Sequence, residues 1–281
     1  MLSVSLWCIP SPRYPETVPE LPEVETVTRS LAPTVGRRIV SAEFRCLRVL
    51  RGGDPDVMSA RVTGSKIAAV KRYGKFILVS LKPSGFLTIH LGMTGKLLLG
   101  GPAGKHTHAI LNLDRGVLLY DDSRQFGRIT FSEEFPTRLG KLGPEPLEVS
   151  FEDFAAGLRR RKTRIKALLL NQDFLRGIGN IYADEALFRA GIHPLALAHR
   201  IRADRARRLY DAIRAVLTEA IEAGGSSISV YVDAEGRKGF FQFSHRVYQR
   251  TGEPCLTCGA PVRRVLVAQR SSHFCPKCQK R

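Results

Sequence analysis

The segment CLTCGAPVRRVLVAQRSSHFCPKC, residues 255–278, decides the fold of the C-terminal end of the chain. It contains two C-x2-C pairs separated by sixteen residues: Cys255 with Cys258, and Cys275 with Cys278. Two residues between cysteines allow both thiolates to face one ion, so this spacing is typical of a tetrahedral four-cysteine zinc site. The sequence therefore predicts one structural Zn²⁺ ion whose four coordination positions are all filled by thiolate.

Two disulfides in an exported protein are the alternative for these cysteines. Residues 1–18, MLSVSLWCIPSPRYPETV, have no basic n-region, and their short apolar run is interrupted by serines, so they read neither as a signal peptide nor as a helix. A cytosol keeps thiols reduced, which favours zinc and a cytoplasmic location. The other two cysteines, Cys8 and Cys46, are isolated and are interpreted as small side chains.

The region before the zinc module is predicted to be helical. Between residues 151 and 223 apolar side chains recur at helical spacing, most clearly at Ala206, Leu209, Ile213, Val216, Leu217, Ala220 and Ile221. Gly224-Gly225 ends this pattern, and residues 226–244, with few regularly spaced apolar positions, are interpreted as a mobile loop. The turn at residues 177–180, GIGN, opens another helix. It either joins two helices in the ordinary way or offers its N–H groups to a DNA phosphate.

The N-terminal half is predicted to consist mainly of strands. Residues 87–91 and 109–113 alternate in side-chain character, and the turn at 114–116 leads into residues 117–120. Residues 66–82 and 85–99 are two further long strand candidates. Several strands with little helix indicate a β-sandwich. One short helix is expected from Pro19 onward, closed by Pro33 and Gly36, because apolar residues recur at Leu21, Val24, Val27 and Leu31.

Length and charge limit the possible functions. The 281 residues suffice for about two domains, and a hydrophobic share of 43% excludes a disordered or fibrous protein. No apolar stretch approaches the roughly 20 residues of a membrane span. With 44 Lys and Arg against 26 Asp and Glu, the net charge of +18 favours a polyanionic partner such as nucleic acid.

Much of the positive charge is concentrated in two segments. Residues 159–166 hold six basic residues in eight, and residues 245–281 hold eight Lys or Arg against one acid, Glu253. A charge run is usually a solvated face. Two basic segments together with the nearby glycine turn instead favour a composite groove for nucleic acid.

Ordered motifs along the chain resemble those of the formamidopyrimidine-DNA glycosylase family. The first is PELPEVET at residues 19–26, and the four-cysteine module is the last. Between them, in the family's order, come GKF at 74–76, IHLGMTG at 89–95, KHTH at 105–108, DSRQFG at 122–127, LGPEP at 142–146 and GIGNIYA at 177–183. The resemblance covers residues 19–281. Leu21 favours the oxidised-purine branch, because the endonuclease VIII branch typically has Gly there.

The resemblance implies an α+β protein with four parts. They are an extension absent from the mature protein (1–18), a catalytic β-sandwich with flanking helices (19–148), a helix–two-turns–helix DNA-binding domain (149–226), and a base-covering loop with a zinc finger (227–281). It also implies a monomeric, bacterial-type base-excision-repair enzyme, cytoplasmic and associated with the nucleoid. The implied partner is double-stranded DNA containing oxidised bases, and no organic cofactor is implied.

The implied reaction has two stages. The secondary amine of an N-terminal proline attacks C1′ of the damaged nucleotide and releases an oxidised purine such as 8-oxoguanine or a formamidopyrimidine. The resulting iminium then promotes β- and δ-elimination at the sugar. An α-amine ordinarily titrates with a pKa of roughly 7.7–8, so part of it is unprotonated at neutral pH, and the Schiff base makes the sugar an electron sink.

The resemblance also assigns catalytic residues. Pro19 is the nucleophile, Glu20 is the acid that assists sugar opening, and Glu23 orients the site. Lys75 is the proton donor in β-elimination, and Arg270 serves in δ-elimination. Without the family, these residues would be interpreted as acids at a helix N-terminus, a strand-surface lysine and a phosphate contact in the finger.

The DNA-binding residues come from the same resemblance. Met93, Arg124 and Phe126 match the trio that fills the hole left by a flipped base; the alternative for Met93 and Phe126 is strand core. Three further residues match positions that hold the DNA backbone: His106, Lys162 and Asn180. Tyr231 and its neighbours fall in the loop that covers the flipped base, and Gln125 stands where relatives often carry a basic residue.

Val18 conflicts with this chemistry, because it acylates the nitrogen of Pro19. An amide nitrogen has no basic lone pair and cannot form an iminium. We expect translation to start at Val18, from a GUG codon read as Met. A proteolytically removed extension and a catalytically inactive DNA binder are the alternatives, and Edman sequencing of the protein from its native host separates them.

Two other functions stay open on the sequence alone. One is a glycosylase that prefers oxidised pyrimidines, and the other is a non-catalytic binder of damaged or nicked DNA. Borohydride trapping on an oligonucleotide containing 8-oxoguanine separates an enzyme from a binder. A zinc-ribbon transcription or ribosomal protein would fit the charge but leaves the first seven motifs unexplained.

Overall fold

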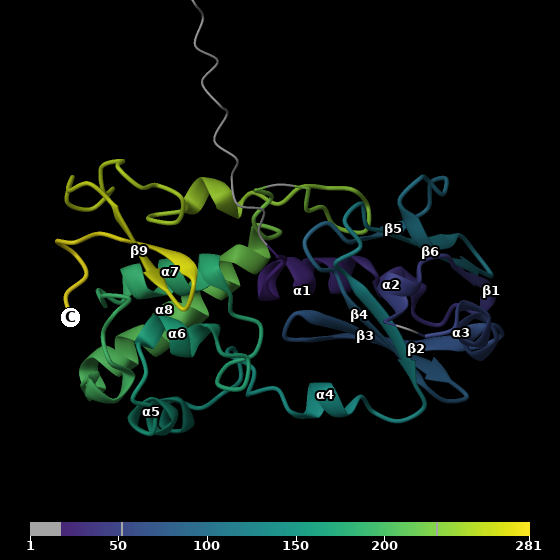
Figure 1. The fold of residues 1–281 in the computed structure, drawn as a ribbon, viewed down its shortest axis with the longest axis horizontal. Helices are drawn as coiled ribbons and strands as arrows, with labels where there is room; N and C mark the ends of the chain where they lie inside the picture. The colour runs from purple at the N-terminus through teal and green to yellow at the C-terminus, as the bar shows by residue number, and fades with distance from the viewer. Residues whose placement is uncertain (1–17, 52, 229) are drawn as a thin grey trace, which may run out of the picture.

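The computed structural model describes residues 18–51, 53–228 and 230–281 (Figure 1). A β-sandwich forms one end of the molecule, helices and the zinc module form the other, and helix α1 (Leu21–Ser30) lies between them (Figure 1). The predicted α+β class with these three parts is confirmed. The interpretation of residues 1–17 lies outside the described residues.

The sandwich consists of two four-stranded antiparallel sheets. One has the order β1-β6-β7-β5 and the other β2-β3-β4-β8. Apolar side chains from both sheets share one core, which includes Ile39, Ile77, Leu111 and Tyr120. The strand bounds are β1 (Ile39–Phe44), β2 (Lys66–Tyr73), β3 (Phe76–Lys82), β4 (Phe86–His90), β5 (Lys96–Leu99), β6 (Thr107–Leu113), β7 (Val117–Asp121) and β8 (Arg128–Ser132).

Both long strands expected from the sequence are wrong. Residues 66–82 fold into the hairpin β2–β3, and residues 85–99 divide into β4 and β5, which belong to different sheets. Glycines cause both breaks: Gly74 has φ +58° and Gly92 has φ +67°, a conformation that L side chains rarely adopt. Each break lies beside a predicted functional residue, Lys75 or Met93.

The expectation of little helix in the N-terminal half is also incomplete. Short helices α2 (Leu47–Leu50) and α3 (Pro55–Val62) follow β1. Asp54 caps α3 by accepting hydrogen bonds from Asp56 and Val57, and Pro55 occupies its first turn. An Asp cap followed by Pro is an ordinary signal for the start of a helix. It was overlooked because the neighbouring residues have the alternating pattern of strands.

The helical part begins after a connecting segment that contains α4 (Thr137–Gly140). Its helices are α5 (Phe151–Arg159), α6 (Ile165–Leu170), α7 (Asn180–Arg189) and α8 (Ala203–Glu222), and they confirm the helical pattern, including its end before Gly224. The zinc module adds the antiparallel hairpin β9 (Arg263–Val267) and β10 (Arg270–Phe274). No helix in the described part of the chain is long and apolar enough to cross a membrane.

Helix α1 contributes to two hydrophobic cores. Leu21, which is fully buried, belongs to the core of the helical part. Val24, Val27 and Leu31 face the core of the sandwich. One ten-residue helix therefore joins the two halves, and the proposed catalytic residues stand at its N-terminal end.

The segment after α8 has little regular structure but is well packed. It contains one 3₁₀ turn, η3 (Phe241–Ser244), and buries Tyr231, Ala234 and Phe241. The Tyr231 hydroxyl donates to the carbonyl of Glu23 or Gly224, at 3.2 and 3.1 Å. The predicted loop is thus anchored on α1, while its mobility stays a prediction.

We predict that Gly127→Ala destabilises the sandwich by about 1–3 kcal/mol, the usual cost of overpacking a core. An added Cβ would overlap the hydroxyl of the buried Tyr120 and lie 2.9 Å from the His90 carbonyl oxygen. Gly140→Ala, where a Cβ meets nothing within 4 Å, is the matched control. Urea unfolding of both variants tests this, and equal stabilities would contradict the packing argument.

Candidate functional site

The Glu20 side chain reaches across to the helical part of the molecule. Its carboxylate accepts hydrogen bonds from the backbone N–H groups of Ile181 (3.0 Å) and Tyr182 (3.4 Å), in the first turn of α7. A helix N-terminus favours negative charge. A carboxylate of the protein therefore occupies these two donors, which follow the turn at residues 177–180, and a phosphate at that turn stays a prediction.

Lys75 approaches the same point from the β2–β3 turn. A Cβ on Gly179 would lie 2.6 Å from the Lys75 ammonium nitrogen and would overlap the Glu20 carboxylate. Glycine at 179 thus allows both groups to lie against the α7 turn. Burial lowers the pKa of the Lys75 ammonium, and the nearby Arg270 charge lowers it further, against the opposing effect of Glu20 and Glu23.

Glu20 is itself enclosed. It is 3% exposed, and burial raises the pKa of its carboxyl above the usual range, although Lys75 and the two backbone donors act in the opposite direction. Burial of this kind favours the protonated form of a carboxyl. Pro19, the residue before it, is buried as well.

Glu23 lies one helical turn further along and is held by several donors. Its carboxylate accepts from the backbone N–H of Glu20 (2.9 Å), from the N–H of Ser226 (2.7 Å) and from the Tyr182 hydroxyl. Burial, and next the charge of Glu20, raises the pKa of the Glu23 carboxyl to about 7. Two coupled carboxyls therefore stand beside Pro19.

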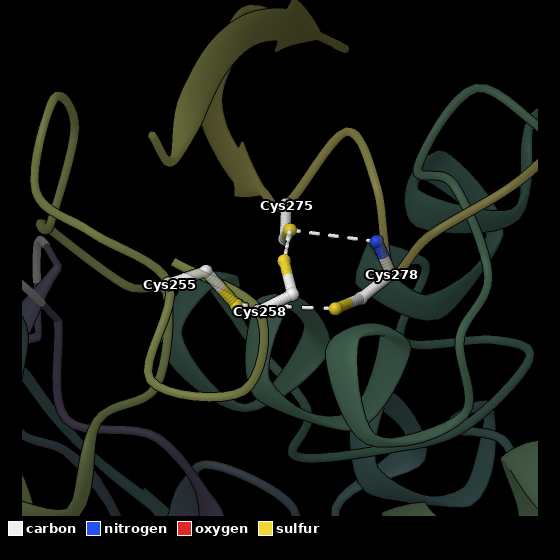
Figure 2. A group of neighbouring side chains, drawn as sticks. All are labelled: Cys255, Cys258, Cys275 and Cys278. Carbon is white, nitrogen blue, oxygen red and sulfur yellow. Dashed lines mark hydrogen bonds between the residues drawn. The ribbon is translucent and has the colours of Figure 1, made fainter. Parts of the chain in front are cut away.

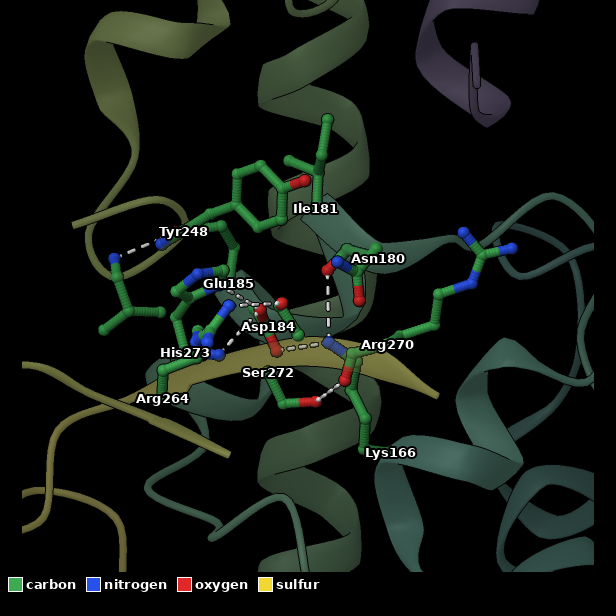
Figure 3. A network of polar contacts seen from close by, with 12 residues as sticks. Lys166, Asn180, Ile181, Asp184, Glu185, Tyr248, Arg264, Arg270, Ser272 and His273 are labelled. Carbon is green, nitrogen blue, oxygen red and sulfur yellow. Dashed lines mark hydrogen bonds and ion pairs between the residues drawn. The ribbon is translucent and has the colours of Figure 1, made fainter. Parts of the chain in front are cut away.

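Arg270 comes from the zinc module and is positioned by a buried polar network (Figure 3). Asp184 of α7 pairs with the Lys166 ammonium and accepts from the His273 backbone N–H at 2.9 Å, and all three residues are buried. Figure 3 shows the exposed Arg270 side chain extending from β10 away from this network. The network therefore fixes the hairpin that carries Arg270 to the helical part.

Lys166 departs from both sequence interpretations of the charge run. It has 0% exposure and lies in an ion pair, so it belongs neither to a solvated face nor to a DNA-contacting groove. The preceding residues 159–164 are exposed, as predicted, and they include Lys162. Asn180, at the first position of α7, is half-buried, and its side-chain oxygen has no hydrogen-bond partner among the described residues.

The predicted void-filling residues lie on two neighbouring turns. The buried Asp122 accepts from the Thr94 hydroxyl and from the backbone N–H of Gly127 at 2.8 Å, which brings the turn of Met93 against residues 122–127. Arg124 and Phe126 stand on this second turn, with the guanidinium 4.6 Å from the ring centroid.

The exposure of these side chains tests the strand-core interpretation, and their role in filling the hole stays a prediction. Phe126 is 45% exposed and Met93 is half-buried, so the strand-core alternative is wrong. The exposed His106 lies close by, because its carbonyl accepts from the Asp122 N–H at 2.9 Å. Gln125, between Arg124 and Phe126, has φ +57°.

Sequence reasoning missed several residues that organise the site. Asp122 and Tyr182 lie inside the motifs at 122–127 and 177–183 but had no predicted role, and Ser226 carried no chemical signal of its own. Glu145, also unassigned, binds Arg72 of β2 in a bidentate pair at 2.8 and 3.0 Å and accepts from Arg176 at 3.1 Å. A polar residue inside a conspicuous motif was the available signal for Asp122 and Glu145.

The four cysteines converge as the spacing predicted (Figure 2). Their sulfur atoms all lie within 4.8 Å of one another, with 3.9 Å between Cys255 and Cys278 and 3.4 Å between Cys258 and Cys275. Four thiolates at the usual Zn–S distance would be about 3.8 Å apart at the corners of a tetrahedron. The site therefore fits one structural Zn²⁺ ion, and Cys46 lies elsewhere, in contact with the sandwich core.

Comparison with known families accounts for most of the chain. Residues 18–129 match the formamidopyrimidine-DNA glycosylase N-terminal domain, residues 142–232 match the formamidopyrimidine-DNA glycosylase H2TH domain, and residues 252–281 match the zinc finger found in FPG and IleRS. The fold and this site define a zinc-containing DNA glycosylase. The chain belongs to the formamidopyrimidine-DNA glycosylase family.

Individual relatives agree with this assignment. The formamidopyrimidine-DNA glycosylase of Solibacter usitatus is 77% identical over 264 residues, which cover 94% of this chain and 100% of the relative. The crystal structure of MutM (Fpg) from Thermus thermophilus superposes with a TM-score of 0.84 at 44% identity, over 93% of this chain and 98% of that chain. A Lactococcus lactis Fpg mutant in complex with Fapy-dG-containing DNA gives 0.87 at 37% identity, over 94% and 100%.

We predict that Asp184→Asn destabilises the protein by about 3–5 kcal/mol, because it leaves the Lys166 charge buried without a partner. Asp211→Asn is a control of equal charge change, since its pair with Arg207 is exposed and is worth at most about 1 kcal/mol. Denaturant unfolding measures both. Similar losses in the two variants would show that the buried pair is not important for stability.

We also predict that Cys258→Ser lowers the zinc content of the purified protein well below one Zn²⁺ per chain, whereas Cys46→Ser leaves one Zn²⁺ per chain. Three ligands hold zinc more weakly than a closed four-thiolate site. Atomic emission of the purified proteins measures the metal, and anisotropy with an abasic-site duplex measures binding. Full zinc content in Cys258→Ser would contradict the assigned ligand set.

Proposed function

We propose that this protein is a base-excision-repair DNA glycosylase with AP lyase activity, which removes oxidised purines such as 8-oxoguanine and formamidopyrimidines from double-stranded DNA. The proposal rests on one arrangement: Glu20 and Lys75 meet at the α7 turn directly beside Pro19. The family membership supplies the reaction class. The protein acts as a monomer in the bacterial cytoplasm, close to the nucleoid.

Pro19 is the nucleophile. Once it is the first residue, its secondary amine attacks C1′ of the damaged nucleotide, and the base leaves. The nitrogen then forms an iminium with the opened sugar. The neighbouring Glu20 accepts from Ile181 at the α7 turn, and this contact supports a fixed position of the adjacent Pro19 relative to the helical part of the molecule.

Glu20 delivers a proton to the ring oxygen of the sugar. Its burial supports this role, because it raises the carboxyl pKa and so favours the protonated form that a proton donor needs. Glu23 orients the site through the hydrogen bond that it accepts from the Glu20 backbone N–H.

The two cations act after base release. Lys75 serves as the proton donor in β-elimination, and its lowered pKa makes proton exchange easier than for an ordinary lysine. Arg270 serves in δ-elimination, where a fixed positive charge stabilises the departing phosphate. The buried pair of Lys166 with Asp184 supports the placement of Arg270.

DNA is held along residues from all parts of the molecule. Met93, Arg124 and Phe126 fill the hole that the flipped base leaves, and their position on exposed turns supports this role. His106, Lys162 and Asn180 hold the backbone. Tyr231 and its neighbours cover the flipped base. Zn²⁺, when bound by the four cysteines, supplies structural stability to the finger rather than chemistry.

The functional boundaries follow from these roles. Residues 19–148 form the catalytic domain, residues 149–226 the helix–two-turns–helix domain, and residues 227–281 the covering loop and finger. Translation starts at Val18 from a GUG codon, so that removal of the initiator Met exposes Pro19. The match to the N-terminal domain family from residue 18 onward supports this start.

We predict that protein beginning at Pro19 is trapped covalently by borohydride on a duplex containing 8-oxoguanine. Protein that retains residues 1–18 should give no adduct, because the nitrogen of Pro19 is then an amide. Intact mass spectrometry verifies each N-terminus before the assay, and gel mobility detects the adduct. Cleavage of the lesion strand by the verified longer protein would show that Pro19 is not the attacking residue.

A further inference from the structure

A chain of buried polar groups leads from Glu23 to a histidine that has no role so far. Ser226, which donates its backbone N–H to Glu23, has its hydroxyl oxygen 3.4 Å from the Tyr182 hydroxyl. The same oxygen lies 3.2 Å from Nε2 of His245. All four residues are buried, at 2% exposure for Glu23, 1% for Tyr182, 3% for Ser226 and 7% for His245.

The groups around His245 keep its ring neutral. Burial, and next the neighbouring His273, lowers the pKa of His245 to about 4. The rings of Phe241 and Tyr248 pack against it at 5.7 and 5.5 Å, and no carboxylate among the described residues pairs with it. We assign the proton of the neutral imidazole to Nε2, so that this nitrogen donates to the Ser226 hydroxyl.

That tautomer sets the direction of the whole chain. Ser226 then donates to the Tyr182 oxygen, and Tyr182 donates to the Glu23 carboxylate, as does the Ser226 backbone N–H. Each donor in such a chain polarises the next, which strengthens the hydrogen bonds at its end. The chain therefore favours the ionised form of Glu23.

The other charged and titratable groups near Glu23 also affect whether its carboxyl is ionised. They are Glu20, whose charge opposes ionisation of Glu23, and the ammonium of Lys75, while Tyr231 contacts only the backbone carbonyl. Two coupled carboxyls do not ionise independently. If Glu23 is held ionised, the proton that the pair retains resides on Glu20, where the proposed acid needs it.

We propose that His245 is a positioning residue for base release: through Ser226 and Tyr182 it holds Glu23 as a hydrogen-bond acceptor and so keeps the shared proton on Glu20. The inference rests on the proposed role of Glu20 as the acid. It assigns a function to the residue that directly follows the segment 226–244, some 220 residues from Glu23 in sequence. Ser226, the first residue of that segment, is the link.

Two substitutions at one position separate hydrogen bonding from packing. His245→Phe keeps an aromatic ring against Phe241 and Tyr248 but removes Nε2. His245→Gln loses the ring but restores an N–H donor near the Nε2 position. All variants are compared as zinc-loaded protein beginning at Pro19, with thermal unfolding as the check on folding.

The assay is single-turnover release of 8-oxoguanine across a pH series, beside strand cleavage at a preformed abasic site. An abasic sugar opens to its aldehyde without a protein acid, so the second reaction does not depend on the Glu20 proton. His245→Phe should slow base release about tenfold, the effect of one ordinary hydrogen bond. It should shift the alkaline limb of the profile to lower pH and leave abasic-site cleavage within about twofold. His245→Gln should recover most of the rate.

A double-substitution cycle completes the test. Ser226→Ala should reproduce the effect of His245→Phe on base release, and the two changes together should be no worse than either alone. Equal losses on both substrates, an unshifted profile, or no recovery in His245→Gln would overturn the proposal. If the unsubstituted protein released no base, the proposed function itself would be refuted. That outcome differs from the three above, in which the unsubstituted protein is active.

Discussion

The carboxylate of Glu20 bound to the N-terminus of α7 is the contact on which the site depends. It joins the first residues of the sandwich domain to the first turn of a helix in the other half. Because Gly179 has no side chain, the Lys75 ammonium reaches the same point. The proposed nucleophile, acid and proton donor thus come from segments that meet at the contact between the two halves, and neither half by itself supplies all the residues of the proposed site.

Basic and acidic residues lie in different parts of the molecule. Basic residues dominate the surface, as the net charge of +18 requires, and they suit a polyanionic duplex. Several acids are instead buried where segments of the protein meet: Glu20, Glu23, Glu145, Asp184 and Glu185. Each is bound by backbone N–H groups, by cations or by a hydroxyl, which offsets the cost of burying its charge. The interior of this strongly cationic protein therefore holds several carboxyl groups.

Sequence patterns predicted individual helices and the zinc site better than the contacts between distant segments of the chain. The cysteine spacing gave the zinc site, and periodicity gave α1 and α8, because both signals are local. Gly74 and Gly92 broke two expected strands, since their positive φ values follow from sheet pairing that a linear pattern does not show. Lys166 was grouped with exposed neighbours, because its partner Asp184 is brought to it only by the packing of α6 on α7. Ser226 and His245 carried no signal, since their importance arises from contacts between distant segments.

Helix α1 has a mechanical consequence for substrate selection. Its Leu21 is embedded in one core and its Val24 and Val27 in the other, and α1 also packs against α8. The two halves cannot separate without exposing apolar surface at both ends of this helix. A duplex bound across both halves would meet a protein that resists opening, so we expect bending and unstacking to fall on the nucleic acid. Sites where a lesion has already weakened stacking deform at lower cost, and stiffness of the enzyme thereby becomes a means of discrimination.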